Sequence, residues 1–269
     1  MAALEQEGGL TKKSKPESGT AKVRQPTTTT CGEWLSDGTL IELVRRDPQK
    51  TELALLVSKG DTMTKNPRAQ YDGQSYVPVE PDASILRAIY IPCGVSEYGT
   101  TRSLFAEVCD VFASRADLSD TTATLLGHFV LSTWFADCLS TAPQMLVLGP
   151  QEEATILLQL LAVTCRRALL LSDVSIATWS SLPTSLRPTL IINARRLRAS
   201  TLDFLQASSV RHQYVVRKGQ LLDLFGAKVI YERTPSGARS LIESAICVTL
   251  NSRTWSIARS ERPGSGANP

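Results

Sequence analysis

Histidine is scarce in this chain of 269 residues, which has only two, and neither stands at metal-ligand spacing from a cysteine. The six cysteines form no CxxC pair, and with no export signal they are expected to be free thiols. No apolar run reaches the roughly 18 residues of a membrane span, and the N-terminus has no apolar signal core. We therefore expect a cytoplasmic protein with no metal site and no membrane partner.

A strong charge of either sign is also absent. The chain has 29 lysines and arginines against 26 aspartates and glutamates, a net charge of only +3. Any affinity for nucleic acid must therefore come from a local cluster rather than from the whole surface. The 42% apolar content is ordinary for a globular protein, and the length suits one large domain or a medium domain with a small companion.

Motifs of nucleophilic hydrolysis are missing as well. There is no GxSxG sequence, and neither histidine has a placed nucleophile beside it. His128 lies in an apolar helical stretch, which indicates a core or interface position. His212 follows Arg211 and reads as a solvated strand residue. Hydrolase chemistry of the Ser-His-Asp kind is therefore not expected.

The chain divides by composition. Residues 1–30 and 258–269 are polar and predict a disordered arm and tail. Residues 31–92 predict a small β-rich module, because Asp37-Gly38 and Asp72-Gly73 stand between apolar runs and favour hairpins. Residues 93–142 show helical spacing and predict a helical pair, in which Ser119 caps the second helix.

Residues 143–257 alternate between short apolar runs and helical segments, the pattern of an α/β core with a mainly parallel sheet covered on both faces. A helix is expected over 152–167, and a hairpin around residues 217–220. The predicted core strands are Met145–Leu148, Ala168–Leu171, Thr189–Ile192, Lys228–Tyr231 and Ile246–Leu250.

The first core strand ends at Gly149-Pro150, directly before a helix. In P-loop proteins such a turn holds phosphates with backbone amides and a lysine, and a later strand ends in a metal-binding carboxylate. The alternative is an ordinary βα unit that never held a nucleotide. The residues of the degenerate nucleotide site are Gly149, Pro150, Glu152, Glu153, Thr155 and Asn193.

Several segments, in this order and spacing, resemble the helicase-like P-loop (AAA+-type) ATPases of bacterial and mobile-element replication genes. They are WLSDGTLIELV, IYIPCGVSEYGTTRSLFAEV, STWFADCLSTAPQMLVLGP, CRRALLLSDVS, PTLIIN, LLDLFGAKVIYE and SLIESAICVTL. The resemblance runs from Trp34 to Leu250. It implies an AAA+-like core and a role in DNA replication or mobilisation. It also leads us to expect Met145–Leu148 and Thr189–Ile192 as adjacent parallel strands.

The chain departs from that family at the nucleotide site. GPQEEAT stands in place of GxxxxGK[ST] and is one residue short, with Glu153 and Ala154 where a glycine and a lysine should precede Thr155. Asn193-Ala194 replaces the expected Asp-Glu, and the late arginine segment reads Glu-Ser-Ala. Carboxylates in the first turn of the helix repel a triphosphate, at ~1 to 4 kcal/mol for each pair of charges ~4 Å apart. No ATP turnover is expected.

A basic stretch follows the third core strand. Its arginines suit phosphate oxygens, although a solvated face is the alternative. We expect Arg195, Arg196 and Arg198 to lie at the edge of the sheet where the catalytic acids would have been. Arg211, Arg217 and Lys218 are expected to join them there. The candidate nucleic-acid contacts are Arg195, Arg196, Arg198, Arg211, Arg217 and Lys218.

These observations favour an ATPase-like pseudoenzyme without a cofactor. It would be a non-catalytic assembly or nucleic-acid-binding component linked to mobile-element or phage-type DNA replication. Its expected partners are DNA, bound without sequence preference, and an intact ATPase of the same family or a second copy of this chain. Two alternatives stay open: an atypical but active ATP-dependent helicase-like ATPase, which would use ATP and Mg²⁺, and a decayed remnant of such an ATPase.

Overall fold

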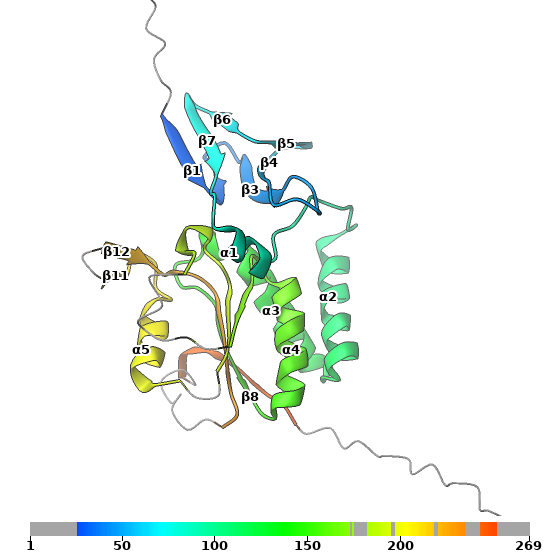
Figure 1. Ribbon diagram of the computed structural model, residues 1–269. Helices are drawn as coiled ribbons and strands as arrows, with labels where there is room; N and C mark the ends of the chain where they lie inside the picture. The colour runs from blue at the N-terminus through cyan, green and yellow to red at the C-terminus, as the bar shows by residue number, and fades with distance from the viewer. Residues whose placement is uncertain are drawn as a thin grey trace, which may run out of the picture.

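The computed structural model describes residues 26–172, 174, 182–194, 197–217, 220–234 and 243–251. A β-rich part made of two small sheets lies above an α/β part in Figure 1, with a short helix, α1 (Ala83–Ala88), between them. The protein is therefore a mixed α/β fold that contains a five-stranded parallel sheet and separate small β-sheets.

The β-rich part contains a three-stranded sheet of order β1-β7-β6 and a four-stranded antiparallel sheet of order β2-β3-β4-β5. The first sheet comprises β1 (Thr27–Thr30), β6 (Ala69–Tyr71) and β7 (Gln74–Pro78). The second comprises β2 (Gly32–Trp34), β3 (Leu40–Arg45), β4 (Leu53–Lys59) and β5 (Thr62–Asn66).

Both predicted hairpins are present. Asp37-Gly38 lies in the turn between β2 and β3. Asp72 and Gly73 form the two-residue turn between β6 and β7, both with positive φ (46° and 73°), as a type I′ turn requires. Strand β1 begins inside the segment predicted as a disordered arm. Its four threonines are β-branched, and pairing with the distant β7 gives them a strand partner that composition does not reveal.

The predicted helical pair is α2 (Thr101–Ala116) and α3 (Asp120–Trp134), followed by a short 3-10 helix, η1 (Ala136–Cys138). Ser119 caps α3, as expected, because its side chain accepts a hydrogen bond from the Thr122 amide. The two helices pack closely at Gly127, where an added Cβ would lie 2.7 Å from Cys109 Sγ.

The five parallel strands have the order β14-β8-β13-β10-β9. They are β8 (Gln144–Leu148), β9 (Leu169–Leu171), β10 (Leu190–Asn193), β13 (Lys228–Glu232) and β14 (Ile246–Thr249). The other elements are α4 (Gln151–Thr164), the 3-10 helix η3 (Thr184–Leu186), α5 (Ala199–Ala207) and the hairpin of β11 (Tyr214–Arg217) and β12 (Gln220–Asp223).

The expectation that the first and third core strands are neighbours is wrong. Strands β8 and β10 are parallel and belong to one sheet, but β13 lies between them and pairs with both. Crossover connections let consecutive strands skip positions, so the order along the chain does not determine the order in the sheet.

Helices cover both faces of the parallel sheet, as Figure 1 shows: α2, α3 and α4 lie on one side and α5 on the other. Alternate residues of β8 face the two layers. Met145 and Val147 pack in the core that contains α2, α3 and α4, whereas Leu146 packs in the core that contains α5. This two-sided burial explains the continuous apolar character of the strands. Over the described ranges, no helix is both long and apolar enough for a membrane span.

A buried ionic cluster joins the β-rich part to the α/β part. Glu42 of β3 accepts hydrogen bonds from Arg167 (Nη2–Oε1, 2.8 Å) and Arg166 (Nη2–Oε2, 2.5 Å), which lie between α4 and β9. Arg166 also binds Asp137 of η1 at 2.5 Å, and Arg187 binds the other oxygen of Asp137 at 3.2 Å. The side chain of Arg167 is fully buried, so its charge depends on this pairing.

Candidate functional site

The candidate site lies where β8, β13 and β10 end. Helix α4 leaves β8 on one face of the sheet, and α5 follows β10 on the other (Figure 1). Open α/β sheets bind ligands in the crevice at the carboxyl ends of their strands. A cavity of about 740 Å³ occupies this edge. The described residues that line it are Gln151, Ser172, Asn193, Tyr231 and Arg233.

The connection from β8 to α4 is only two residues long, Gly149 and Pro150. Gly149 has φ +134°, and an added Cβ would lie 2.6 Å from the carbonyl oxygen of Leu250, which follows β14. The Tyr231 hydroxyl donates to the Gly149 carbonyl at 2.9 Å. Packing between strand ends therefore accounts for the glycine, and this tight turn does not provide the longer loop that wraps phosphates in P-loop proteins.

A side-chain amide joins Thr155 and Asn193, two residues of the predicted nucleotide site. The Gln151 Nε2 group donates to Asn193 Oδ1 at 3.1 Å and lies 3.4 Å from Thr155 Oγ1. The Thr155 hydroxyl donates to the Gln151 carbonyl at 2.7 Å, so its oxygen is free to accept from the amide. A neutral NH₂ group thus bridges the two side-chain oxygens.

The other residues of the predicted motif provide no positively charged side chain for a phosphate. Ala154, at the position expected for the lysine, is fully buried in the core beside Leu157 and Leu158. A lysine at this position would start from the core side of α4 and not from the cavity. Glu152 and Glu153 stand in the first turn of α4. The positive end of the helix dipole stabilises their carboxylates there, and these carboxylates would repel a phosphate group.

Arg233 is the only charged residue among the described residues that line the cavity. Tyr231 contributes a hydroxyl, and burial raises the pKa of this phenol, so it remains a hydrogen-bond donor at neutral pH. The described lining thus combines two amides, two hydroxyls and one guanidinium. This set can bind polar groups through hydrogen bonds, but it contains no carboxylate for a metal.

The six basic residues do not form one patch. Arg198 is exposed at the start of α5, on the carboxyl side of β10. Arg211 lies at the opposite edge, where its guanidinium donates to the carbonyls of Leu139, Ala136 and Asp137 just before β8. The same guanidinium stacks 4.5 Å above the Phe225 ring. Arg195, Arg196 and Lys218, and the side chain of Arg217, lie outside the described residues.

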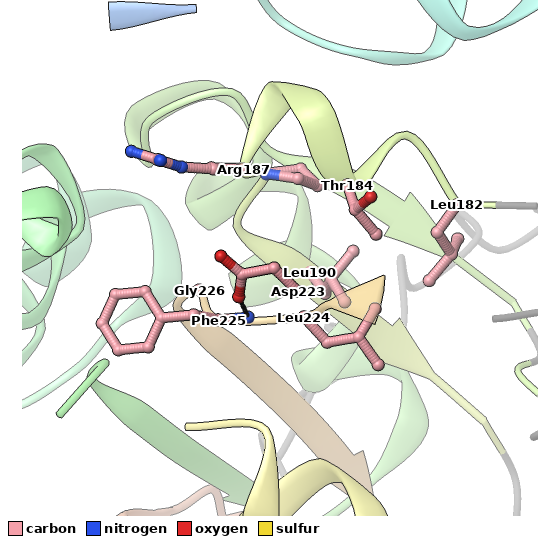
Figure 2. Close-up of a pocket in the computed structure, with 9 residues that line it drawn as sticks. Leu182, Thr184, Arg187, Leu190, Asp223, Leu224, Phe225 and Gly226 are labelled. Carbon is pink, nitrogen blue, oxygen red and sulfur yellow. Dashed lines mark hydrogen bonds between the residues drawn. The ribbon is translucent and has the colours of Figure 1, made fainter. Parts of the chain in front are cut away.

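Figure 2 shows a much smaller pocket, whose lining includes Thr184, Arg187 and Phe225. Its volume of about 20 Å³ is close to the size of one water molecule. The Asp223 carboxylate, which points into this region, accepts a hydrogen bond from the Phe225 amide at 3.0 Å. Within the described ranges, no group of three His, Cys, Asp or Glu side chains could hold a metal ion.

Of the described residues that line the cavity, the sequence predicted only Asn193; it did not predict Gln151, Ser172, Tyr231 or Arg233. Gln151 is the first residue of α4, and the P-loop motif assigns no role to its position. Tyr231 and Arg233 lie at the end of β13, and only the insertion of this strand between β8 and β10 brings them to the cavity.

The chain matches no protein-family model and no curated protein sequence. Among solved structures, it is similar to the apo structure, in its A form, of the C-terminal region of NrS-1, at 11% sequence identity and a TM-score of 0.41. The match covers 80% of this chain and 61% of that chain, so this chain spans about three fifths of that structure. A likeness this distant carries no argument about function.

Proposed function

We propose that the protein is an ATPase-like pseudoenzyme that does not hydrolyse ATP and acts as a non-catalytic assembly or nucleic-acid-binding component. One observation carries the proposal: the Gln151 amide donates to both Thr155 and Asn193, the two side chains that would have to hold Mg²⁺ if this were an active P-loop site. A bound Mg²⁺ would have to break this bridge, and Asn193 would then offer it a neutral oxygen in place of a carboxylate.

Two further features support the loss of catalysis. The two-residue turn after β8 is closed by Tyr231 and Leu250, so it cannot open into a phosphate-binding loop without losing the Tyr231 hydrogen bond to Gly149. The first turn of α4 carries two carboxylates and no lysine. A link to mobile-element or phage-type DNA replication rests on the resemblance of the sequence segments alone.

Calorimetric titration of Mg-ATP into the full chain tests the proposal. We expect no binding heat and no turnover. The control is Gln151→Ala, which frees Thr155 and Asn193 but restores neither the lysine nor the carboxylate. This variant should also show no binding heat and no turnover. Turnover of ~1 s⁻¹, in the range of working enzymes, that is abolished by Thr155→Ala would refute the pseudoenzyme and establish the active ATPase.

The nucleic-acid role rests on the carboxyl edge, where Arg198 is exposed, and on Arg195 and Arg196, which stand three and two residues before it in the chain. Fluorescence anisotropy with duplex DNA should give dissociation constants of ~10⁻⁴ to 10⁻⁶ M at physiological salt. Changing the three arginines to alanine should reduce the salt slope by at most about three units. The lysines at 12, 13 and 15 are replaced by alanine in both the parent protein and the variant that lacks the three arginines, because their charges would also produce salt-dependent binding.

Truncation is a poor substitute for those lysine replacements, since β1 begins at Thr27 and a chain that starts near Cys31 would lose this strand. Salt-independent or absent binding would remove the nucleic-acid role and leave assembly with a partner. A protein that binds neither DNA, nor a second copy of itself, nor an intact ATPase of the same family would correspond to the decayed remnant.

A further inference from the structure

A second cavity, the junction cavity, lies between the β-rich part and the helical pair, remote from the carboxyl edge of the parallel sheet. Its volume is about 500 Å³. One wall comes from β2, β3 and β4 and includes Trp34, Leu40 and Leu56. The opposite wall comes from the end of α3 and includes Trp134 and Phe135. Cavities of roughly 300 to 1,000 Å³ with mostly apolar walls are typical of small-molecule sites.

The aromatic rings around this cavity are exposed to an unusual degree. Trp34 is 66% exposed, Phe135 is 62% exposed and Trp134 is 38% exposed. Large apolar side chains that gather on a surface mark binding sites more often than scattered ones do. The orientation of Trp134 is set, because its indole nitrogen donates to the Thr164 carbonyl at 3.0 Å. One ring is therefore held in place before any ligand arrives.

The polar groups at the cavity are paired. Arg166, which lines it, binds both Glu42 and Asp137. Burial opposes the charge of Arg166, but the two carboxylates outweigh it and raise the pKa of the guanidinium. The third carboxylate, Glu33, accepts a hydrogen bond from Thr30 at 3.0 Å.

The charges of this region also balance. Three carboxylates and one guanidinium line the cavity, and two further guanidiniums pair with these carboxylates from outside the lining, so the region as a whole carries no net charge. An ionic ligand would lose its hydration without gaining a counter-charge, which is costly in apolar surroundings. The residues are Glu33, Glu42 and Asp137 against Arg166, Arg167 and Arg187.

We propose that the junction cavity binds an uncharged, planar aromatic small molecule, which stacks against Trp34, Trp134 and Phe135. Offset and edge-to-face ring contacts supply attraction beyond burial alone. The ionic cluster keeps the two walls in place, so the cavity is formed before binding and little ordering cost is added. The site is separate from the carboxyl edge and does not depend on whether the protein binds nucleotide.

The test uses the full chain and N-phenyl-1-naphthylamine, a neutral aromatic probe whose emission rises in apolar surroundings. Titration should raise the emission of the probe and quench tryptophan emission. Trp34→Ala and Phe135→Ala should each weaken binding roughly tenfold. Because both side chains are mostly exposed, neither change should disturb folding. Tyr214→Ala is the matched control: this tyrosine is 53% exposed on the β11–β12 hairpin, and its loss should change nothing.

A filling variant gives an independent measurement. Gly94 lines the cavity, and an added Cβ there would meet no atom within 4 Å, so Gly94→Leu introduces a bulky side chain at the site from a backbone position with room for its Cβ. It should also weaken binding of the probe. The anionic probe 1-anilinonaphthalene-8-sulfonate should bind at least roughly tenfold more weakly than the neutral one.

Three results would overturn the proposal. The first is a dissociation constant for the neutral probe above about 1 mM. The second is binding that is equally tight in the Trp34, Phe135 and Gly94 variants, which would place the probe elsewhere. The third is a wild-type dimer, seen by size-exclusion chromatography, that Trp34→Ala converts to a monomer, because the aromatic surface would then be an interface between copies of this chain.

Discussion

The ionic cluster at Glu42 gives a sharp test of how the two parts of the molecule are joined. In Glu42→Gln, the side chain keeps its shape but loses the charge that faces Arg166 and Arg167. The Arg167 side chain is 0% exposed and still donates to the carbonyls of Cys31 (2.7 Å) and Leu186 (2.8 Å), so its hydrogen bonds survive in part. Its buried charge, however, loses its only directly paired carboxylate among the described residues.

Removing one partner of a buried ion pair typically costs about 3 to 5 kcal/mol, because the other charge stays buried without compensation. Arg166 keeps Asp137, and Arg167 keeps its carbonyl partners, so we expect the lower end, about 3 kcal/mol. Urea unfolding followed by circular dichroism should show the midpoint fall by ~1 M or more, since slopes of ~1 to 3 kcal/mol per molar are usual.

The matched control is Glu52→Gln, in the same β-rich part. Glu52 pairs with Arg46 at 3.5 Å, but both side chains are more than half exposed, so the loss should stay below about 1 kcal/mol. Equal, small losses in the two variants would show that the cluster does not hold the two parts together and that the junction cavity is not preformed.

Three further predictions concern Lys228, Gly149 and Gly127. Lys228 is fully buried, and burial lowers its pKa to about 7. Between pH 7 and about 10 the unfolded chain therefore binds a proton at this lysine that the folded chain does not. Because of this difference, the free energy of unfolding should rise by up to ~1.4 kcal/mol per pH unit. Lys228→Met should remove this rise in urea titrations, and a pH dependence unchanged from wild type would contradict it. Gly149→Ala should destabilise the protein by at least ~1 to 3 kcal/mol, from the strain at φ +134° and the clash with Leu250, whereas Gly94→Ala should cost less than about 0.5 kcal/mol; similar thermal midpoints would refute this. Gly127→Ala should lower the melting temperature, because its Cβ would lie 2.7 Å from Cys109 Sγ, and a Cys109→Ala background should recover part of the loss.

Local patterns in the sequence predicted much of the secondary structure. The turn at Asp72-Gly73, the Ser119 cap, the apolar strands and the hairpin around residues 217–220 are all present. Each depends on residues close together in the chain: positive φ in a two-residue turn, a side-chain oxygen over a free amide, or a run that is buried on both faces. The threonine strand β1 was missed because its partner, β7, lies more than forty residues away.

At the candidate site, the sequence showed which groups were absent, because a lysine and a carboxylate can be read as missing from a motif. It did not show what replaces them. The Gln151 bridge between Thr155 and Asn193, and the arrival of Tyr231 and Arg233 at the cavity, depend on the path by which β13 enters the sheet between β8 and β10. Likewise, Arg198 and Arg211 are close in the sequence, but α5 runs the length of the sheet and carries them to opposite edges. The sequence by itself determined the local elements and the residue types that follow each strand. Only the tertiary structure decided which side chains meet, because those contacts depend on crossover connections between segments far apart in the chain.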